Sequence, residues 1–186
     1  MYIYPDGRLS ILRERGMTTQ WHSLKAWLAA HEPDLLADLG PPAGESAIKA
    51  LELRVGVALP PDFEASLRAH DGQHGRAAWL FDGYQYLSIE NILMSWEAWH
   101  ELSVGGDFDG RVARPDSAIR NVWWHDGWVP FASNGGGDYM CLDLAPEPMG
   151  TVGQVIRVFH DMPQRVLVAP SFSAWFDSFV GRKTDH

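Results

Sequence analysis

Hydrophobic and polar positions follow helical spacing in the first half of the chain and strand-like runs in the second half. Apolar residues recur every three or four positions from Thr19 to Leu39, which predicts an amphipathic helix with Thr18 or Thr19 as its N-cap. The residue before a proline avoids the helical region, so this helix is expected to break before Pro33.

Four more helices are predicted, and each has its own start or stop signal. The stretch LGPPAGE separates the first helix from one that begins near Glu45 and closes at Gly56. A third begins at Pro61 and is stopped by Gly72, and a fourth is capped by Ser88. The last is capped by Ser171 and carries the aromatic stripe Phe172, Trp175, Phe176 and Phe179.

Strand-like runs are short and are separated by turn residues. A hairpin is expected over Tyr2 to Leu12, where Pro5-Asp6-Gly7 supplies the turn. The run AAWLF, the pair YL that follows it, and five later segments read as strands: 119–124, 128–132, 139–144, 154–159 and 166–169. The segment from Gly105 to Ala118 has no periodicity and is expected to be a long exposed loop.

The order of these elements predicts the fold class. Helices come first, strands cluster after them, and one helix returns at the end, with no regular alternation of strand and helix. This order indicates an α+β fold in which helices pack on one face of a mostly antiparallel, twisted sheet. A chain of 186 residues buries enough surface to form a single domain, here 1–186, without disulfides or a structural metal.

Charge narrows the kinds of partner. Fifteen Lys and Arg against 24 Asp and Glu give a net charge of -9, which argues against direct binding of nucleic acid, because such proteins need clustered cations. Acids are concentrated from Glu32 to Glu64 and from Glu101 to Glu147, and these segments would steer a basic protein toward the chain. The alternative is an acidic surface that serves solubility.

The remaining bulk features predict a cytoplasmic protein. The N-terminal residues lack the pattern of a secretory signal, and no run of about eighteen apolar residues predicts a membrane span. The single cysteine, Cys141, lies in an apolar run and is expected to be an inert, buried thiol. No cofactor is expected.

Four segments resemble motifs of one protein family, the SUKH superfamily of Smi/Knr-like proteins. The first, LPPDFEASLRAHDG, includes Pro60 and Gly72, and the second, WVPFA, includes Trp128 and Pro130. The third, GDYMCLDLAPEPMGTVGQVI, is the most specific, and the fourth is SFSAWF. The resemblance assigns structural roles to the motif residues Pro60, Gly72, Trp128, Pro130, Asp143, Gly150 and Gly153.

The resemblance implies a non-enzymatic α+β domain that binds a protein partner. Residues 45–180 would form the SUKH-like core and residues 1–44 an N-terminal helical and hairpin extension. In bacteria, members of this family commonly serve as immunity proteins of polymorphic toxin systems, so the partner would be a basic toxin domain, often a nuclease. Fungal members suggest instead a regulatory scaffold in cell-wall assembly. Asp71 and Asp138 stand where many relatives carry Asn.

An enzymatic alternative rests on three His-Asp pairs, at positions 70–71, 125–126 and 160–161. Together they suggest a small metal-dependent hydrolase, but two of the pairs lie at predicted turns and no HExxH pattern is present. The glycine-rich SNGGGD segment lacks the Lys-Ser/Thr and the helix of a phosphate loop. Asp143 and Glu147 would form a carboxylate pair, although Asp143 is better explained as an acceptor for backbone amides of the following turn.

A partner-binding surface is expected near the acidic loop and the adjacent tryptophans. Neighbouring residues of a strand point to opposite faces, so one of Trp123 and Trp124 should face outward and anchor an interface. Packing beneath the Gly105 to Ala118 loop is the alternative. The residues predicted to contact a partner are Asp107, Asp109, Trp123, Trp124, Asp138 and Tyr139.

Overall fold

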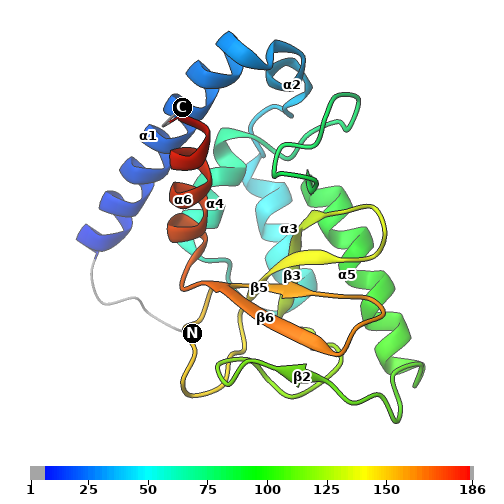
Figure 1. The fold of residues 1–186 in the computed structure, drawn as a ribbon. Coiled ribbons are helices and arrows are strands. Elements are labelled where there is room, and N and C mark those ends of the chain that lie inside the picture. Colours follow the sequence, from blue (N-terminus) through cyan, green and yellow to red (C-terminus); the bar gives the residue numbers. More distant parts are fainter. Residues whose placement is uncertain (1–6, 185–186) are drawn as a thin grey trace.

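The structure, a computed structural model, describes the backbone of residues 7–184 and the side chains of residues 16–184 (Figure 1). The helices of this part are α1 (Gly7–His31), α2 (Pro33–Asp38), α3 (Glu45–Val55), α4 (Pro61–Ala69), α5 (Ile89–Val104) and α6 (Phe172–Thr184). The strands are β1 (Gln85–Tyr86), β2 (Arg114–Pro115), β3 (Trp128–Ser133), β4 (Tyr139–Asp143), β5 (Gln154–Val158) and β6 (Gln164–Ala169).

The strands form one sheet in the order β1-β3-β4-β5-β6-β2. Every neighbouring pair is antiparallel except β2 and β6, which run parallel over two residues each. A bulge between Pro130 and Ala132 interrupts the β3–β4 register. The sheet and its packed helices confirm the α+β class predicted from the sequence.

Helices α1, α4 and α6 lie beside one another and cover one side of the sheet (Figure 1). Aromatic rings join the layers: the Trp21 ring lies 4.9 Å from Phe176, and Phe131 on β3 lies 4.9 Å from Trp175. Met17, Trp21, Leu24 and Leu28 of α1 are buried in the same hydrophobic core as the sheet. Helix α1 is therefore an integral part of the packed core.

Tryptophans cover the other side of the sheet. Tyr139 and Cys141 share one face of β4, opposite Met140 and Leu142, because side chains alternate along a strand. Trp99 of α5 meets Tyr139 edge-on at 6.4 Å and stacks on Trp124 at 5.0 Å. The central strands are therefore covered on both faces, whereas Val166, Leu167 and Val168 of the outer strand β6 stay exposed.

Most predicted helix boundaries are confirmed, but the predicted start of the first helix is wrong: α1 begins at Gly7, so Thr18 and Thr19 lie inside it and are not its N-cap. The first helix ends at His31, and α2 begins at Pro33, so the break expected at this proline occurs. Gly56 closes α3 with a left-handed φ of 76°. The hydroxyl of Ser88 accepts the Asn91 amide at the start of α5, and that of Ser171 accepts the Ala174 amide at the start of α6.

The predicted N-terminal hairpin is wrong in its second strand. Residues from Gly7 onward belong to α1, and the first strand lies outside the described residues. Short runs such as RLSIL contain residues that suit a helix as well as a strand, and a strand also needs a partner to pair with. The predicted extension therefore consists of the helices α1 and α2 from Gly7 to Asp38, followed by a non-helical connection to α3.

Two further predicted strands, the AAWLF segment and segment 119–124, do not form. In each, a side chain from elsewhere in the chain bonds a backbone group that strand pairing would use. In the AAWLF segment, Leu80 donates its backbone N–H to the Gln73 side chain. In segment 119–124, the Trp123 carbonyl accepts both Nε and Nη2 of Arg165, at 3.0 and 2.6 Å. The backbone groups that a strand would use for pairing are bonded elsewhere. The predicted long loop, in turn, contains the short strand β2.

Candidate functional site

The signature segment after β4 is held by a buried network centred on Asp143. The Asp143 carboxylate accepts the Ala145 amide at 3.0 Å and Nε2 of Gln154 at 2.9 Å. The same Nε2 donates to the carbonyl of Ala118, and the other amide atom of Gln154 accepts the Thr151 N–H. Burial raises the pKa of Asp143, and the Gln154 hydrogen bond opposes this rise. This carboxylate closes a turn at the end of the sheet.

Glycines and a proline pack closely around this network. A side chain at Gly150 would place a Cβ 2.5 Å from the Ala118 carbonyl oxygen, and one at Gly153 would lie 2.9 Å from Pro60. Gly153 also has a φ of +86°, which favours glycine. Trp128 and Pro130 lie opposite Asp143 and Cys141 in the β3–β4 register. Pro60, Trp128, Asp143, Gly150 and Gly153 therefore meet at one end of the sheet, whereas Gly72 packs against Leu87 and Ser88.

The His-Asp pairs lie apart and are engaged in separate local bonds. Nδ1 of His70 lies 2.8 Å from the Gly40 carbonyl oxygen, and Asp71 accepts the Ile89 amide at the start of α5. Nδ1 of His125 accepts the Gly127 amide at 2.9 Å. Burial lowers the pKa of both histidines and raises that of Asp71. These residues build turns and a helix start.

Three side chains of the described region do converge: Asp138, His160 and Asp161 have potential ligand atoms within 4.8 Å of one another. His160 is bonded to Asp138 through Nδ1 at 2.9 Å, and this bond raises the pKa of His160. Asn134 donates to the second oxygen of Asp138. The cluster thus ties two turns together at the surface, and neither His125 nor Asp143 belongs to it.

The predicted outward tryptophan is wrong, because both neighbours are buried. Trp123 and Trp124 are 7% and 5% exposed, since the strand that would have separated their faces does not form. Trp123 lies between two guanidinium groups, with Arg111 at 4.8 Å and Arg165 at 4.7 Å from the ring centre. Burial lowers the pKa of Arg165 to about 10. Trp123 therefore packs beneath the loop, as the alternative interpretation expected.

The other residues predicted to contact a partner lie nearer the surface. Asp107 and Asp109 are exposed on either side of Phe108, whose ring packs 5.3 Å from Trp99. Tyr139, half-buried, meets the same Trp99, and Asp138 precedes it in the chain. The structure thus arranges the acidic loop and the start of β4 around one tryptophan. Binding of a partner there stays a prediction.

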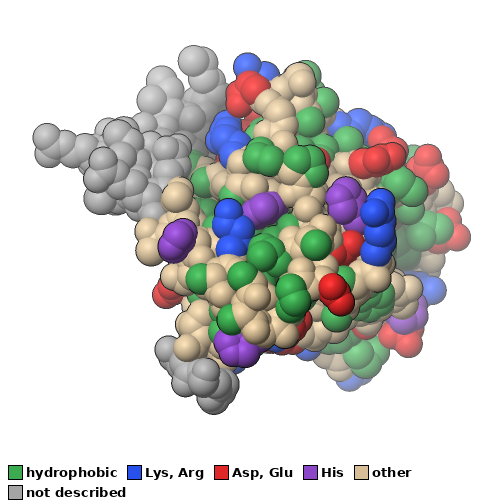
Figure 2. All heavy atoms as spheres, turned by 90° about the horizontal axis from the view of Figure 1, so that it is seen from above, with side chains coloured by type: hydrophobic (Ala, Val, Ile, Leu, Met, Phe, Trp, Pro, Cys, Tyr) green, Lys and Arg blue, Asp and Glu red, His purple; other side chains and the backbone are tan. Residues whose placement is uncertain are grey.

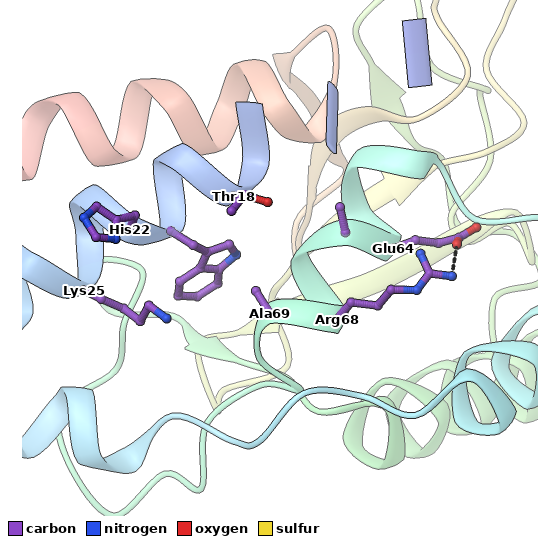
Figure 3. Close-up of a pocket in the computed structure, with 8 residues that line it drawn as sticks. Thr18, His22, Lys25, Glu64, Arg68 and Ala69 are labelled. Atoms are coloured by element: carbon purple, nitrogen blue, oxygen red, sulfur yellow. Dashed lines mark ion pairs between the residues drawn. The ribbon is translucent and has the colours of Figure 1, made fainter. Parts of the chain in front are cut away.

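A groove between α1 and α4 is a feature that the sequence reasoning did not find. Its volume is about 710 Å³, and its lining residues are Thr18, Trp21, His22, Lys25, Glu64, Ala65, Arg68 and Ala69 (Figure 3). Helical spacing indicated that both helices are amphipathic, but it carried no information on which helices would be neighbours. The two small alanines in α4 were the available signal.

The surface of the described residues is mixed in character. On the face seen from above, apolar, basic, acidic and histidine side chains are interspersed (Figure 2). No helix in the part that the structure describes combines the length and the apolar composition needed to cross a bilayer. The structure therefore presents local surface features: the acidic loop, the Asp138–His160 corner and the α1–α4 groove.

The fold and its signature segment define a class of α+β domains. In this class the buried polar residues of the signature, here Asp143 and Gln154, hold the turn at one end of the sheet. The chain belongs to the SMI1/KNR4 family (SUKH-1), whose model matches residues 42–178. This result confirms the resemblance seen in the four sequence motifs.

Curated relatives are fungal proteins with regulatory names. The chain is 30% identical to "Cell wall biosynthesis/cell cycle regulator smi1" of Schizosaccharomyces pombe, over 92% of the chain and 36% of the relative. It is 24% identical to "Cell wall assembly regulator SMI1" of Saccharomyces cerevisiae, over 86% of the chain and 39% of that relative. It is 23% identical to "Glucan synthesis regulatory protein" of Neurospora crassa, over 84% and 36%. The chain thus spans less than half the length of these relatives.

Proposed function

We propose that the chain acts as a regulatory module that binds another protein and does not catalyse a reaction. The observation that carries this proposal is the use made of Asp143, the acid of the most specific family motif. Both of its oxygens accept internal hydrogen bonds, and the residue is buried. A catalytic carboxylate must reach the proton that it transfers, whereas this one holds a turn.

The regulatory names of the fungal relatives support a role in cell-wall assembly as the first specific candidate. Deleting the gene in its own organism should then increase sensitivity to agents that weaken the cell wall. The wild-type gene should restore resistance, and a variant with His125→Ala and His160→Ala should restore it equally if no chemistry is involved. Loss of rescue by this variant, with its fold intact, would contradict the non-catalytic proposal.

The exposed acids favour immunity against a basic toxin as the second candidate. The net charge is -9, and Asp107 and Asp109 project from a surface loop. Charge complementarity speeds association, which suits an inhibitor that must act before its target does damage. The test is co-expression with the product of each neighbouring gene. Protection from a product that is otherwise lethal would support immunity, and absence of protection against all of them would favour the cell-wall role.

A direct binding experiment tests the feature that both candidates share. The tagged chain is used to isolate a partner from its own organism, and the affinity of the purified pair is then measured. Replacing Asp107 and Asp109 by Lys should weaken the pair and reduce its salt dependence, whereas replacing the distant, exposed Asp34 by Lys should have little effect. Equal effects of both changes would place the contact elsewhere.

A further inference from the structure

The α1–α4 groove has two charged walls. Lys25 reaches from α1 toward Ala69, and Glu64 and Arg68 lie on the opposite helix (Figure 3). Arg68 is already shared by two carboxylates, with Glu64 at 2.8 Å and Glu45 at 3.1 Å. Lys25, in contrast, makes no ion pair within the described part of the chain. Among the described residues, Lys25 is therefore a cation without an ion pair at the groove.

The charge at this groove differs from that of the chain as a whole. The lining includes two cations, Lys25 and Arg68, and one acid, Glu64, in a chain whose net charge is -9. Arg68 is offset by Glu64 at 2.8 Å and by Glu45 at 3.1 Å, so Lys25 is the cation of the lining that has no ion pair among the described residues. An acidic ligand would therefore be attracted by the charge of Lys25, and a basic ligand would be repelled by it.

The floor of the groove is apolar and held in place. Trp21 donates its indole N–H to Oγ of Ser66 at 3.0 Å, and that hydroxyl contacts the buried Tyr86 hydroxyl at 3.2 Å. The small side chains of Ala65 and Ala69 leave the space above. A volume of about 710 Å³ suits a short peptide segment or a few of its side chains. A fixed floor also reduces the ordering needed on binding.

We propose that the α1–α4 groove receives an acidic peptide segment of a protein partner. One carboxylate of the segment pairs with Lys25, and an apolar side chain next to it packs against the half-buried Ala65 and Ala69, above the buried Trp21. This proposal rests on the protein-binding function and names the chemistry of one contact. The groove also combines α4, which lies in the family-matched residues 42–178, with α1, which precedes them.

The test uses synthetic peptides, so it does not depend on identifying the natural partner. Fluorescein-labelled peptides that alternate Glu with Leu or Phe are compared with the same peptides carrying Gln, and with others carrying Lys, in place of Glu. Binding to the full chain is measured by fluorescence anisotropy at several salt concentrations. The Glu peptides should bind most tightly, and their affinity should fall as salt rises.

Three variants locate the binding. Lys25→Glu should lower the affinity about tenfold, because it replaces an attraction by a repulsion. Ala65→Leu should also lower it by filling the groove, while α4 stays helical because Leu suits a helix. Arg114→Glu makes the same charge change on β2, an exposed position at the far edge of the sheet from the groove, and should have little effect (Figure 1).

The outcomes separate the groove from the wider proposal. Equal binding of the Glu and Gln peptides, or equal losses for Lys25→Glu and Arg114→Glu, would overturn the groove assignment. So would unchanged affinity in Ala65→Leu, once circular dichroism and melting show that this variant is folded. If a natural partner binds the wild type and Lys25→Glu equally well, the protein-binding function stands and the groove assignment falls.

Discussion

At the scale of single residues, Asp143 should contribute more to stability than any exposed acid. Asp143→Ala removes the acceptor for the Ala145 amide and for Nε2 of Gln154. The Ala145 amide then loses its acceptor and Nε2 of Gln154 keeps only the Ala118 carbonyl, so the free energy of unfolding should fall by about 1 to 3 kcal/mol, the cost of a buried donor left unpaired. Urea denaturation provides the measurement. Asp107→Ala, at an exposed position, should change stability by less than about 0.5 kcal/mol, and an equal loss in both variants would contradict this assignment.

The His160–Asp138 pair should make stability depend on pH. The hydrogen bond that His160 donates to the Asp138 carboxylate raises the pKa of His160. A pKa raised in the folded state means that the pair adds stability below the unfolded-state pKa of about 6.5 and loses it as pH rises through the folded-state pKa. NMR titration of Asp138→Asn should therefore give a lower His160 pKa than the wild type. The pKa of His125, lowered by burial, should not move, and a change in both would indicate a general rearrangement.

At the scale of elements, two glycines with similar backbone angles should respond differently to the same change. Gly56 at the end of α3 and Gly72 before β1 have φ values of 76° and 67°. A Cβ at Gly72 would lie 2.2 Å from the backbone nitrogen of Ser88, whereas one at Gly56 meets nothing within 4 Å. Gly56→Ala should cost about 1 kcal/mol from conformation alone. Gly72→Ala should cost several-fold more, and thermal melting that shows equal losses would sink this explanation.

The same scale explains which elements could be predicted. Helix starts and stops depend on residues that are close in sequence. The Ser88 hydroxyl, for example, accepts the backbone N–H of Asn91 three positions later, so the sequence pattern predicts this helix start. Segment 119–124 has strand-like composition, but the Trp123 carbonyl is bonded to Arg165, 42 positions away. A contact of that range is invisible to local patterns. The same contact covers the Trp123 ring, whereas Trp124 is buried against Trp99 and Trp128.

At the scale of the whole molecule, the candidate surfaces depend on how elements meet. The acidic loop could be predicted because its charged residues are identified directly from the sequence. Asp107 and Asp109 are exposed, as expected. The α1–α4 groove could not, because its walls come from helices whose pairing is set by the shared core around Trp21 and Phe176. Sequence patterns identified amphipathic helices. The packing decided which polar residues face each other.

The position of α1 in that core gives a prediction about the limits of the folding unit. The family model begins at residue 42, yet four α1 side chains are at most 1% exposed: Met17, Trp21, Leu24 and Leu28. The S. pombe match covers 92% of the chain, so it leaves roughly fifteen residues outside and must include much of α1. The segment before the family-matched region should therefore be required for stable folding.

A chain of residues 42–186 should accordingly lose cooperative unfolding, because the apolar faces of α4 and α6 would be exposed to water.

A full-length Trp21→Ala variant tests the same contact with less damage, and its free energy of unfolding should fall by about 3 to 5 kcal/mol. Leu53→Ala, at a position 83% exposed, is the control and should stay within about 0.5 kcal/mol of the wild type. Calorimetry decides the matter: if the shortened chain melts as sharply and at the same temperature as the full chain, α1 is an accessory and the α1–α4 groove is not a fixed part of the fold. If cooperativity is lost, the groove exists only in the folded protein, and a partner that occupies it binds only folded molecules.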